Sequence, residues 1–397
     1  MASEFDILAI NARAKRDVLA GHTVINGCVG TLRDDDHTLL TFTEVKKALQ
    51  DSAYSYLDYS PLFGIEKFKV GVTTWLFNGE ADKILKQDNY FFAATMGGTG
   101  AIFSCFKYMK NCDAPLIIPD IIWPNYFGIT RGIGNDVYKF EIIKNGKFNF
   151  AGLEENIVEI LKTHTHLMIA INDPCENPIG YCFSDEEYKK LFSLLEKYNK
   201  DGNTVDLLLD IAYIDYAERR PYFFNFINKK HNYSIYLAYS ASKSLGVYGI
   251  RCGALLCFAS SKDEALKLKD QIETITRGTV SAPNHQAIGP VSEVLTNPAA
   301  CDHIRKEIHY YYNILTNREA KMKDALKEFG IKYLPYEAGF FVTIIVKKDA
   351  YEICHELMNE HIFLSPLRKD LIRVGICSLN EAEIHTIIER ISTLQKE

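Results

Sequence analysis

The sequence predicts an α/β protein with a mostly parallel sheet that is sandwiched by helices. In the central part of the chain, short apolar runs that end in polar or glycine residues alternate with stretches in which apolar residues recur at helical spacing. Short uninterrupted apolar runs are typical of strands buried on both faces, and parallel strands need helical connections. The length of 397 residues indicates about two to three domains.

The expected strands are apolar runs, and each should bring the residues that follow it to an edge of the sheet. The clearest connecting helix starts at Ser184, where Glu187 completes a capping box, and its apolar stripe extends to Tyr198. Sites in such sheets gather at the carboxyl ends of strands. The expected strands are 90–95, 115–118, 167–171, 205–209, 235–239 and 252–258.

The two ends of the chain are expected to form a smaller α+β domain. A long helical pattern over 302–328 leads into the apolar runs 339–344 and 371–374, and the N-terminal segment is expected to fold back against them. We therefore predict a large domain over 46–300, and a small domain that combines 1–45 with 301–397.

Composition excludes several classes of protein. The net charge is −6, with lysines scattered among acidic residues, so no basic stripe favours nucleic acid. No apolar run approaches the roughly 18 residues that span a bilayer, and no basic-then-apolar leader opens the chain. We expect a cytoplasmic protein with no membrane partner. The ten cysteines include no Cys-x-x-Cys pair, which favours buried free thiols over disulfides or a metal site.

Lys243 lies in the most informative segment, directly after the expected strand 235–239. The segment 240–251 also contains Ser240, two glycines and Arg251. A lysine amine forms a Schiff base with an aldehyde, and hydroxyls with a guanidinium suit a phosphate. Pyridoxal 5'-phosphate carries both groups. The alternative is a polar turn with a solvated Lys243.

Two further expected strands end in residues that such a cofactor needs. The run 205–209 ends in Asp210, where a buried carboxylate needs a cation such as a protonated pyridine nitrogen. Tyr213 is placed to donate its phenol to the ring oxygen. The alternative for Asp210 is a helix N-cap. The run 167–171 leads into a loop rich in Asn, Pro and Gly, from which Asn177 could also reach the ring oxygen.

A glycine-rich turn follows the first expected strand. Gly98 and Thr99 precede the helical run 101–110, so free amides at the helix start could bind phosphate. The turn matches neither a nucleotide P-loop nor a dinucleotide-binding signature.

Taken in order along nearly the whole chain, these segments resemble the fold-type I pyridoxal-phosphate enzymes, and among them the class I aspartate/aromatic aminotransferases. The resemblance implies a seven-stranded type of sheet and ping-pong transamination by a Schiff-base mechanism. It favours aspartate or glutamate as substrate, with aromatic amino acids possible, and a homodimer with shared active sites. The implied cofactor-binding residues are Tyr59, Gly98, Thr99, Trp123, Asn177, Asp210, Tyr213, Ser240, Lys243 and Arg251, with Lys243, Asp210 and Tyr213 catalytic.

The resemblance also implies substrate-binding residues. Gly30 and Asn177 would lie by the substrate, and Arg373 would bind its α-carboxylate. Arg277 would bind a distal carboxylate across the dimer interface, and the alternative is a surface arginine. Tyr59 would reach the phosphate bound by the neighbouring subunit.

The chain departs from the family pattern at several positions. Tyr126 stands where histidine is common, Ile179 where threonine is usual, and Ala282 where asparagine often follows. The segment 244–246, directly after Lys243, lacks the aromatic and asparagine residues that are frequent in the family, which leaves the subfamily open but not the cofactor. A lyase that eliminates from the β-carbon remains an alternative on the same fold. A DNA-binding regulator is disfavoured, because the residues before Ile25 are too few for a helix-turn-helix unit.

Overall fold

The computed structural model describes residues 5–227 and 229–396. They form two compact units. The large unit comprises Thr41–Pro174 and Phe183–Glu307, and the small unit comprises Met1–Leu40, Cys175–Cys182 and Ile308–Glu397.

The small unit includes the short loop Cys175–Cys182, which the sequence-based prediction assigned to the large domain. In this loop, Gly180 O accepts hydrogen bonds from Glu337 N (2.9 Å) and Ala338 N (3.1 Å), and Pro178 O accepts one from Thr343 Oγ1 (2.7 Å). Hydrogen bonds over such long sequence separations have no local signature, so the sequence pattern did not reveal them.

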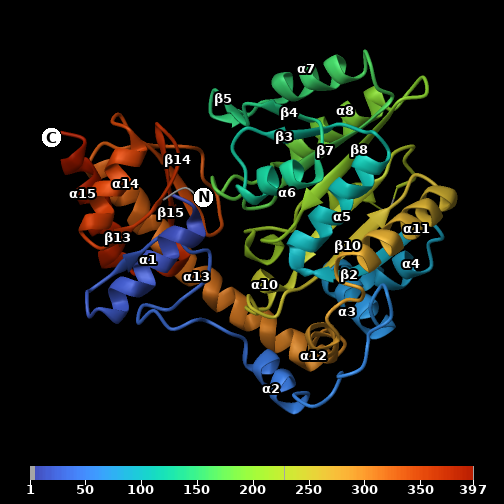
Figure 1. Cartoon of the computed structure of the whole chain (residues 1–397), viewed down its shortest axis with the longest axis horizontal. Helices are drawn as coiled ribbons and strands as arrows, with labels where there is room; N and C mark the ends of the chain where they lie inside the picture. The colour runs from blue at the N-terminus through green and yellow to red at the C-terminus, as the bar shows by residue number, and fades with distance from the viewer. Residues whose placement is uncertain (1–4, 228, 397) are drawn as a thin grey trace. The chain divides into compact units, whose positions relative to one another are not determined.

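A seven-stranded sheet forms the centre of the large unit, and the predicted fold class is confirmed (Figure 1). Strand β10 runs antiparallel to both of its neighbours, and the remaining pairs are parallel. The strand order is β2 (Tyr90–Met96), β10 (Cys252–Phe258), β9 (Ile235–Ser240), β8 (Thr204–Asp210), β7 (His166–Asn172), β3 (Leu116–Pro119) and β4 (Val137–Phe140).

One strand of this sheet was missing from the predicted set. Strand β4 lies at the edge and is mostly half-buried, so it lacks the uninterrupted apolar run of the central strands. Elsewhere the apolar runs and the strands agree, because the central strands are fully buried.

Helices cover the sheet and anchor its loops. Three of them, α5 (Gly97–Asn111), α6 (Asn125–Ile133) and α11 (Lys262–Thr279), share one apolar core with the strands. Helix α8 (Asp185–Tyr198) has the predicted capping box and packs against α7 (Phe150–Ile160) and β8.

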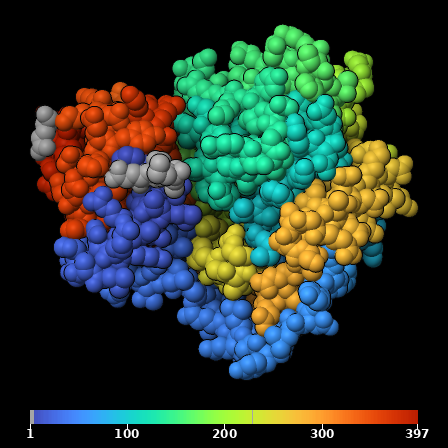
Figure 2. Space-filling view, viewed as in Figure 1, coloured from blue at the N-terminus to red at the C-terminus, as the bar shows by residue number. Residues whose placement is uncertain are grey.

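Helices α2 (Thr43–Asp51), α3 (Glu66–Phe77) and α12 (His285–Leu295) pack together at the end of the large unit away from β4 (Figure 1). At the surface, the blue segment that contains α2 lies against the orange α12 (Figure 2). The other elements of this unit are α4 (Ala81–Leu85), β5 (Ile143–Lys144), β6 (Lys147–Phe148), α9 (Phe224–Ile227), α10 (Ala241–Ser244) and the 3-10 turns Asn78–Glu80 and Ile214–Tyr216.

The small unit is an α+β structure. Helix α13 (Pro298–Glu328) contributes residues to both units. The antiparallel sheet has the order β11 (Lys332–Tyr333), β12 (Phe341–Ile345), β15 (Leu371–Gly375) and β14 (Ser365–Arg368). The other elements are α1 (Ile7–Leu19), α14 (Ala350–Asn359), the turn Ile376–Ser378, α15 (Glu381–Leu394) and the parallel pair β1 (Ile25–Asn26) and β13 (Ile362–Phe363).

Within the described residues, no helix combines the length and the apolar character that a bilayer crossing requires.

Candidate active site

Lys243 lies one turn beyond the end of β9. All six residues of β9 are buried, and the short helix α10 starts immediately after Ser240. The Lys243 Nζ lies 4.5 Å from the ring centre of Tyr248 and 5.8 Å from that of Tyr213. The lysine is thus held half-buried between aromatic rings. Tyr248 was not among the predicted site residues, although it follows Lys243 by five positions.

Arg251 forms a hydrogen-bonded cluster with two hydroxyl groups and the Tyr248 carbonyl. Its Nη1 donates to Ser242 Oγ (3.3 Å) and to Tyr248 O (3.0 Å), and its Nη2 donates to Thr99 Oγ1 (3.4 Å). Thr99 is in the first turn of α5, where backbone N–H groups lack partners within the helix. A guanidinium, two hydroxyls and free amides at one place suit a phosphate.

The glycines of the turn before α5 make this arrangement possible. Gly97 has a φ of +69°, and a Cβ atom there would lie 2.6 Å from Arg251 Nη2. Any side chain at this position would therefore displace the guanidinium. Gly98 follows and lies beside Ser240. Ser242 also belongs to the cluster, and the sequence-based list omitted it in favour of Ser240.

Asp210 is the buried acid of the site. It is the last residue of β8, and its Oδ1 accepts a hydrogen bond from Ala212 N (3.2 Å). Its Oδ2 accepts one from Tyr126 Oη (3.2 Å). Burial raises the pKa of Asp210 to about 6, although these two hydrogen bonds and Lys243 act in the opposite direction. A cation at this position would restore the charged form.

Tyr126 and Trp123 lie at the start of α6. Tyr126 is fully buried, and its ring meets that of Trp123 edge-on at a centroid distance of 6.3 Å. The phenol is a neutral donor to Asp210, whereas a histidine could also carry a positive charge. The departure at Tyr126 therefore changes the electrostatics around the acid without removing its hydrogen bond.

The small unit contains a second group of predicted site residues. Arg373, buried in β15, donates from Nη1 to Asn177 Oδ1 (3.1 Å) and from Nη2 to Cys28 O (2.7 Å). Its guanidinium lies over the ring of Phe341, 4.3 Å from the ring centre. A Cβ atom at Gly30 would lie 2.6 Å from the same ring. Phe341, which sequence reasoning missed, thus packs between Gly30 and Arg373.

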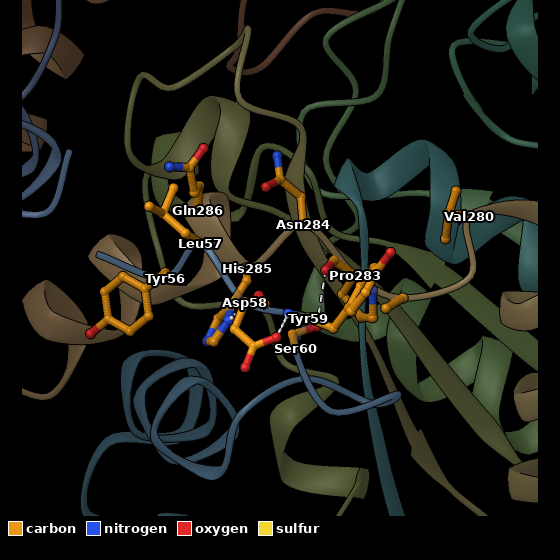
Figure 3. Close-up of a pocket in the computed structure, with 11 residues that line it drawn as sticks. Tyr56, Leu57, Asp58, Tyr59, Ser60, Val280, Pro283, Asn284, His285 and Gln286 are labelled. Carbon is orange, nitrogen blue, oxygen red and sulfur yellow. Dashed lines mark hydrogen bonds between the residues drawn. The ribbon is translucent and has the colours of Figure 1, made fainter. Parts of the chain in front are cut away.

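Tyr59 and Arg277 are exposed to solvent, unlike the buried residues around Asp210. Tyr59 is 86% exposed and lines a pocket with Leu57 and Val280 (Figure 3). Arg277 is in the last turn of α11 rather than in a loop, and its side chain is 64% exposed. Its Nε lies 3.3 Å from Glu273 Oε1. An exposed pair of this kind contributes little to stability.

The large unit thus contains the groups that fit pyridoxal 5'-phosphate. Lys243 supplies an amine, Asp210 a buried acid, and the Arg251 cluster, for which Gly97 leaves room, supplies groups that suit a phosphate. In the part of the chain that the structure describes, no group of three or more His, Cys, Asp or Glu residues is placed to hold a metal ion.

Comparisons with known proteins agree with this assignment. The family model described as aminotransferase class I and II matches residues 22–391. The chain is 26% identical to an aspartate aminotransferase of Pseudomonas aeruginosa, over 98% of this chain and 97% of that protein. It is also 26% identical to a mitochondrial aspartate aminotransferase of Xenopus tropicalis, over 97% of this chain and 90% of that protein.

Solved structures show the same fold. A crystal structure of an aminotransferase from Anaerococcus prevotii superposes with a TM-score of 0.90 at 28% identity, covering 100% of this chain and 97% of that one. An aromatic amino acid aminotransferase from Burkholderia pseudomallei, covalently bound to pyridoxal phosphate, gives a TM-score of 0.81 at 21% identity, covering 100% and 98% of the two chains.

Proposed function

The chain belongs to the aminotransferase class I and II family, and we propose that it moves an amino group between an amino acid and a 2-oxo acid. Its cofactor is pyridoxal 5'-phosphate. The observation that carries this proposal is the placement of Lys243 beside the Arg251 cluster, with the buried Asp210 in the same unit. These residues supply an amine, a phosphate site and an acid for a ring nitrogen.

The bound cofactor supplies an aldehyde that condenses with amines and a protonated ring that withdraws electrons from the substrate's α-carbon. Lys243 Nζ would hold the aldehyde between turnovers, and during turnover it would move a proton from the substrate's α-carbon. The Asp210 carboxylate would hold the proton on the ring nitrogen. Tyr213 and Asn177 would donate to the ring oxygen, and Trp123 would stack on the ring.

The remaining residues bind and orient. The residues that would bind the phosphate are Arg251, Thr99, Ser240 and the first residues of α5 through their amides, including that of Gly98. Arg373 binds the substrate's α-carboxylate, and Gly30 leaves room beside Phe341. The contacts of Arg373 with Asn177, Cys28 and Phe341 support this role, because they fix the plane of the guanidinium.

A panel of amino acids tested with 2-oxoglutarate, with glutamate as the measured product, tests the proposed reaction. Aspartate is expected to give glutamate only when the 2-oxo acid is present. Pyruvate released from cysteine without any 2-oxo acid would indicate elimination from the β-carbon and contradict the proposal.

Exposed apolar side chains support a homodimer with shared sites, in which Tyr59 reaches the phosphate site of the neighbour. Tyr54, Leu57 and Tyr59 are 92%, 71% and 86% exposed, and Leu57, Tyr59 and Val280 line one pocket (Figure 3). Contiguous exposed apolar groups on a folded protein mark interaction surfaces. A cytoplasmic location stays a prediction from the sequence.

Hybrid dimers test the shared site. Lys243→Ala and Tyr59→Ala chains are each expected to be nearly inactive, yet dissociating and reassociating a mixture should restore activity. One of the two sites in each hybrid then contains Lys243 from one chain and Tyr59 from the other. Random exchange predicts about a quarter of the wild-type activity per site. No recovery, with hybrids verified by mass, would contradict the proposal.

Arg277 is proposed to bind the distal carboxylate of an acidic substrate bound by the partner chain. Arg277→Ala is expected to lower kcat/KM for aspartate by about 10²-fold and to spare phenylalanine, because a charge-assisted contact contributes about 3 kcal/mol. The control is Arg219→Ala, since Arg219 is another exposed arginine paired with an acid, Asp185. Equal losses for both substrates would exclude this role.

A further inference from the structure

We propose that Cys175 and Cys182 form a redox site, in which the two thiols are reversibly oxidised to a disulfide. The Cys182 Sγ lies 3.8 Å from the Cys175 Sγ and donates a hydrogen bond to it. Both thiols are reduced in the structure. This site is separate from the chemistry proposed for Lys243, and the sequence favoured buried free thiols over disulfides.

The loop that carries the pair already brings its ends together. Glu176 N donates to Tyr181 O (2.9 Å), and Gly180 N donates to Glu176 O (2.6 Å). Cys175 and Cys182 lie directly outside the first of these bonds. A disulfide has a sulfur separation of about 2.0 Å, so the sulfurs must approach by about 2 Å. Rotation of two short side chains can supply much of this movement.

The two thiols have different environments, which assigns their roles. Cys182 is half-buried, whereas Cys175 is buried. Cys175 N donates a hydrogen bond to Cys182 Sγ (3.3 Å), which holds this sulfur beside Cys175. Cys182 is therefore the sulfur that an oxidant reaches first, and Cys175 is the resolving thiol.

With a peroxide as oxidant, the reaction has two steps. The Cys182 thiolate attacks one peroxide oxygen, the O–O bond breaks, and the first water leaves once the displaced oxygen is protonated. The Cys175 sulfur then attacks the resulting sulfenic acid, forming the S–S bond and releasing the second water. Two thiols are thus oxidised while one peroxide is reduced to two waters. A dithiol reductant reverses the change by exchange.

The disulfide would close the loop that carries Asn177. Asn177 Oδ1 accepts a hydrogen bond from Arg373, and Gly339 packs directly against Cys175. Drawing the sulfurs together shifts the ends of this loop, so the hydrogen bond that orients Arg373 is strained. We expect oxidation to raise the KM for the amino acid about 10-fold, the effect of losing one hydrogen bond of about 1.4 kcal/mol. This consequence rests on the proposed function, whereas the disulfide itself does not.

Mass spectrometry tests the disulfide directly. Trypsin cleaves after Lys162 and Lys189, and the peptide between these sites contains Cys175 and Cys182 and no other cysteine. After treatment with hydrogen peroxide and alkylation in denaturant, the peptide is expected to be about 2 Da lighter and to carry no alkyl group. Treatment with a dithiol before alkylation should instead give the doubly alkylated peptide.

Single variants provide the controls. Cys175→Ser should leave Cys182 as a sulfenic or sulfinic acid, and Cys182→Ser should leave Cys175 alkylatable. Cys112→Ser removes an exposed cysteine elsewhere and should leave the disulfide unchanged. Both thiols remaining alkylatable at a peroxide concentration that oxidises Cys112 would overturn the proposal, as would a doubly sulfinic peptide. A disulfide with an unchanged KM would overturn only its link to activity, and an untreated protein without transamination would contradict only the proposed function.

Discussion

The Lys243→Ala variant is expected to lose transamination by at least about 10⁴-fold, because it removes both the amine that holds the cofactor and the base that moves the proton. Borohydride treatment should fix the cofactor to the wild-type tryptic peptide that contains Lys243 and to no peptide of the variant. The loss should appear with every amino acid, since the proton transfer is common to all of them.

Lys267→Ala is a suitable control for this experiment. Lys267 belongs to the same unit and pairs with Glu264 on the surface of α11, so its loss should leave turnover and cofactor attachment unchanged. A Lys243→Ala protein that transaminates at the wild-type rate would refute the assignment. Loss of activity with an unfolded protein would show only that the variant is unstable, so its thermal unfolding must be measured alongside.

Much of the fold could be predicted from the sequence, because the strands of the large unit are buried on both faces. The runs that form β7, β8, β9 and β10 are apolar except for Asp206 in β8, and each ends close to where the pattern indicated. The edge strand β4 and the assignment of 175–182 to the small unit were missed. Both depend on tertiary packing, which produces no hydrophobic periodicity in the local sequence.

The candidate site was predictable where a residue type is unusual for its position. Lys243 is a lone lysine after an apolar strand, and Asp210 is an acid at the end of another. Because isolated charges are costly to bury, both positions indicate functional residues. Phe341 and Ser242 are not unusual for their positions, so the sequence did not indicate them. A phenylalanine in a strand is ordinary core, and only the structure shows that this one faces Arg373. Arg277 and Tyr59 are exposed in the single chain, so their proposed roles depend on a second one.

Asp210→Asn is expected to lower kcat by about 10³-fold or more while making the cofactor-free protein more stable at neutral pH. The rate falls because a neutral amide does not keep the ring nitrogen protonated, a loss of about 4 kcal/mol in the transition state. The stability rises because burial raises the pKa of Asp210 to about 6. The unfolded chain loses this proton near pH 3.8, whereas the folded chain retains it up to about pH 6.

The sign of the effect follows from proton binding. Between pH 3.8 and about 6 the folded state holds more protons at Asp210 than the unfolded state does, so the free energy of unfolding falls as the pH rises. Above pH 6 the whole penalty is present, up to about 3 kcal/mol for a shift of about two pKa units.

Asparagine keeps the shape of the side chain and cannot ionise. Thermal unfolding of the cofactor-free proteins should therefore show Asp210→Asn more stable than wild type at pH 7.5 and equal to it at about pH 3, where both states of wild type are protonated. Saturating pyridoxal 5'-phosphate should reverse the order at pH 7.5, since only the carboxylate pairs with the protonated ring. Equal stabilities of the two cofactor-free proteins at both pH values would show that Asp210 is not a buried acid awaiting a cation.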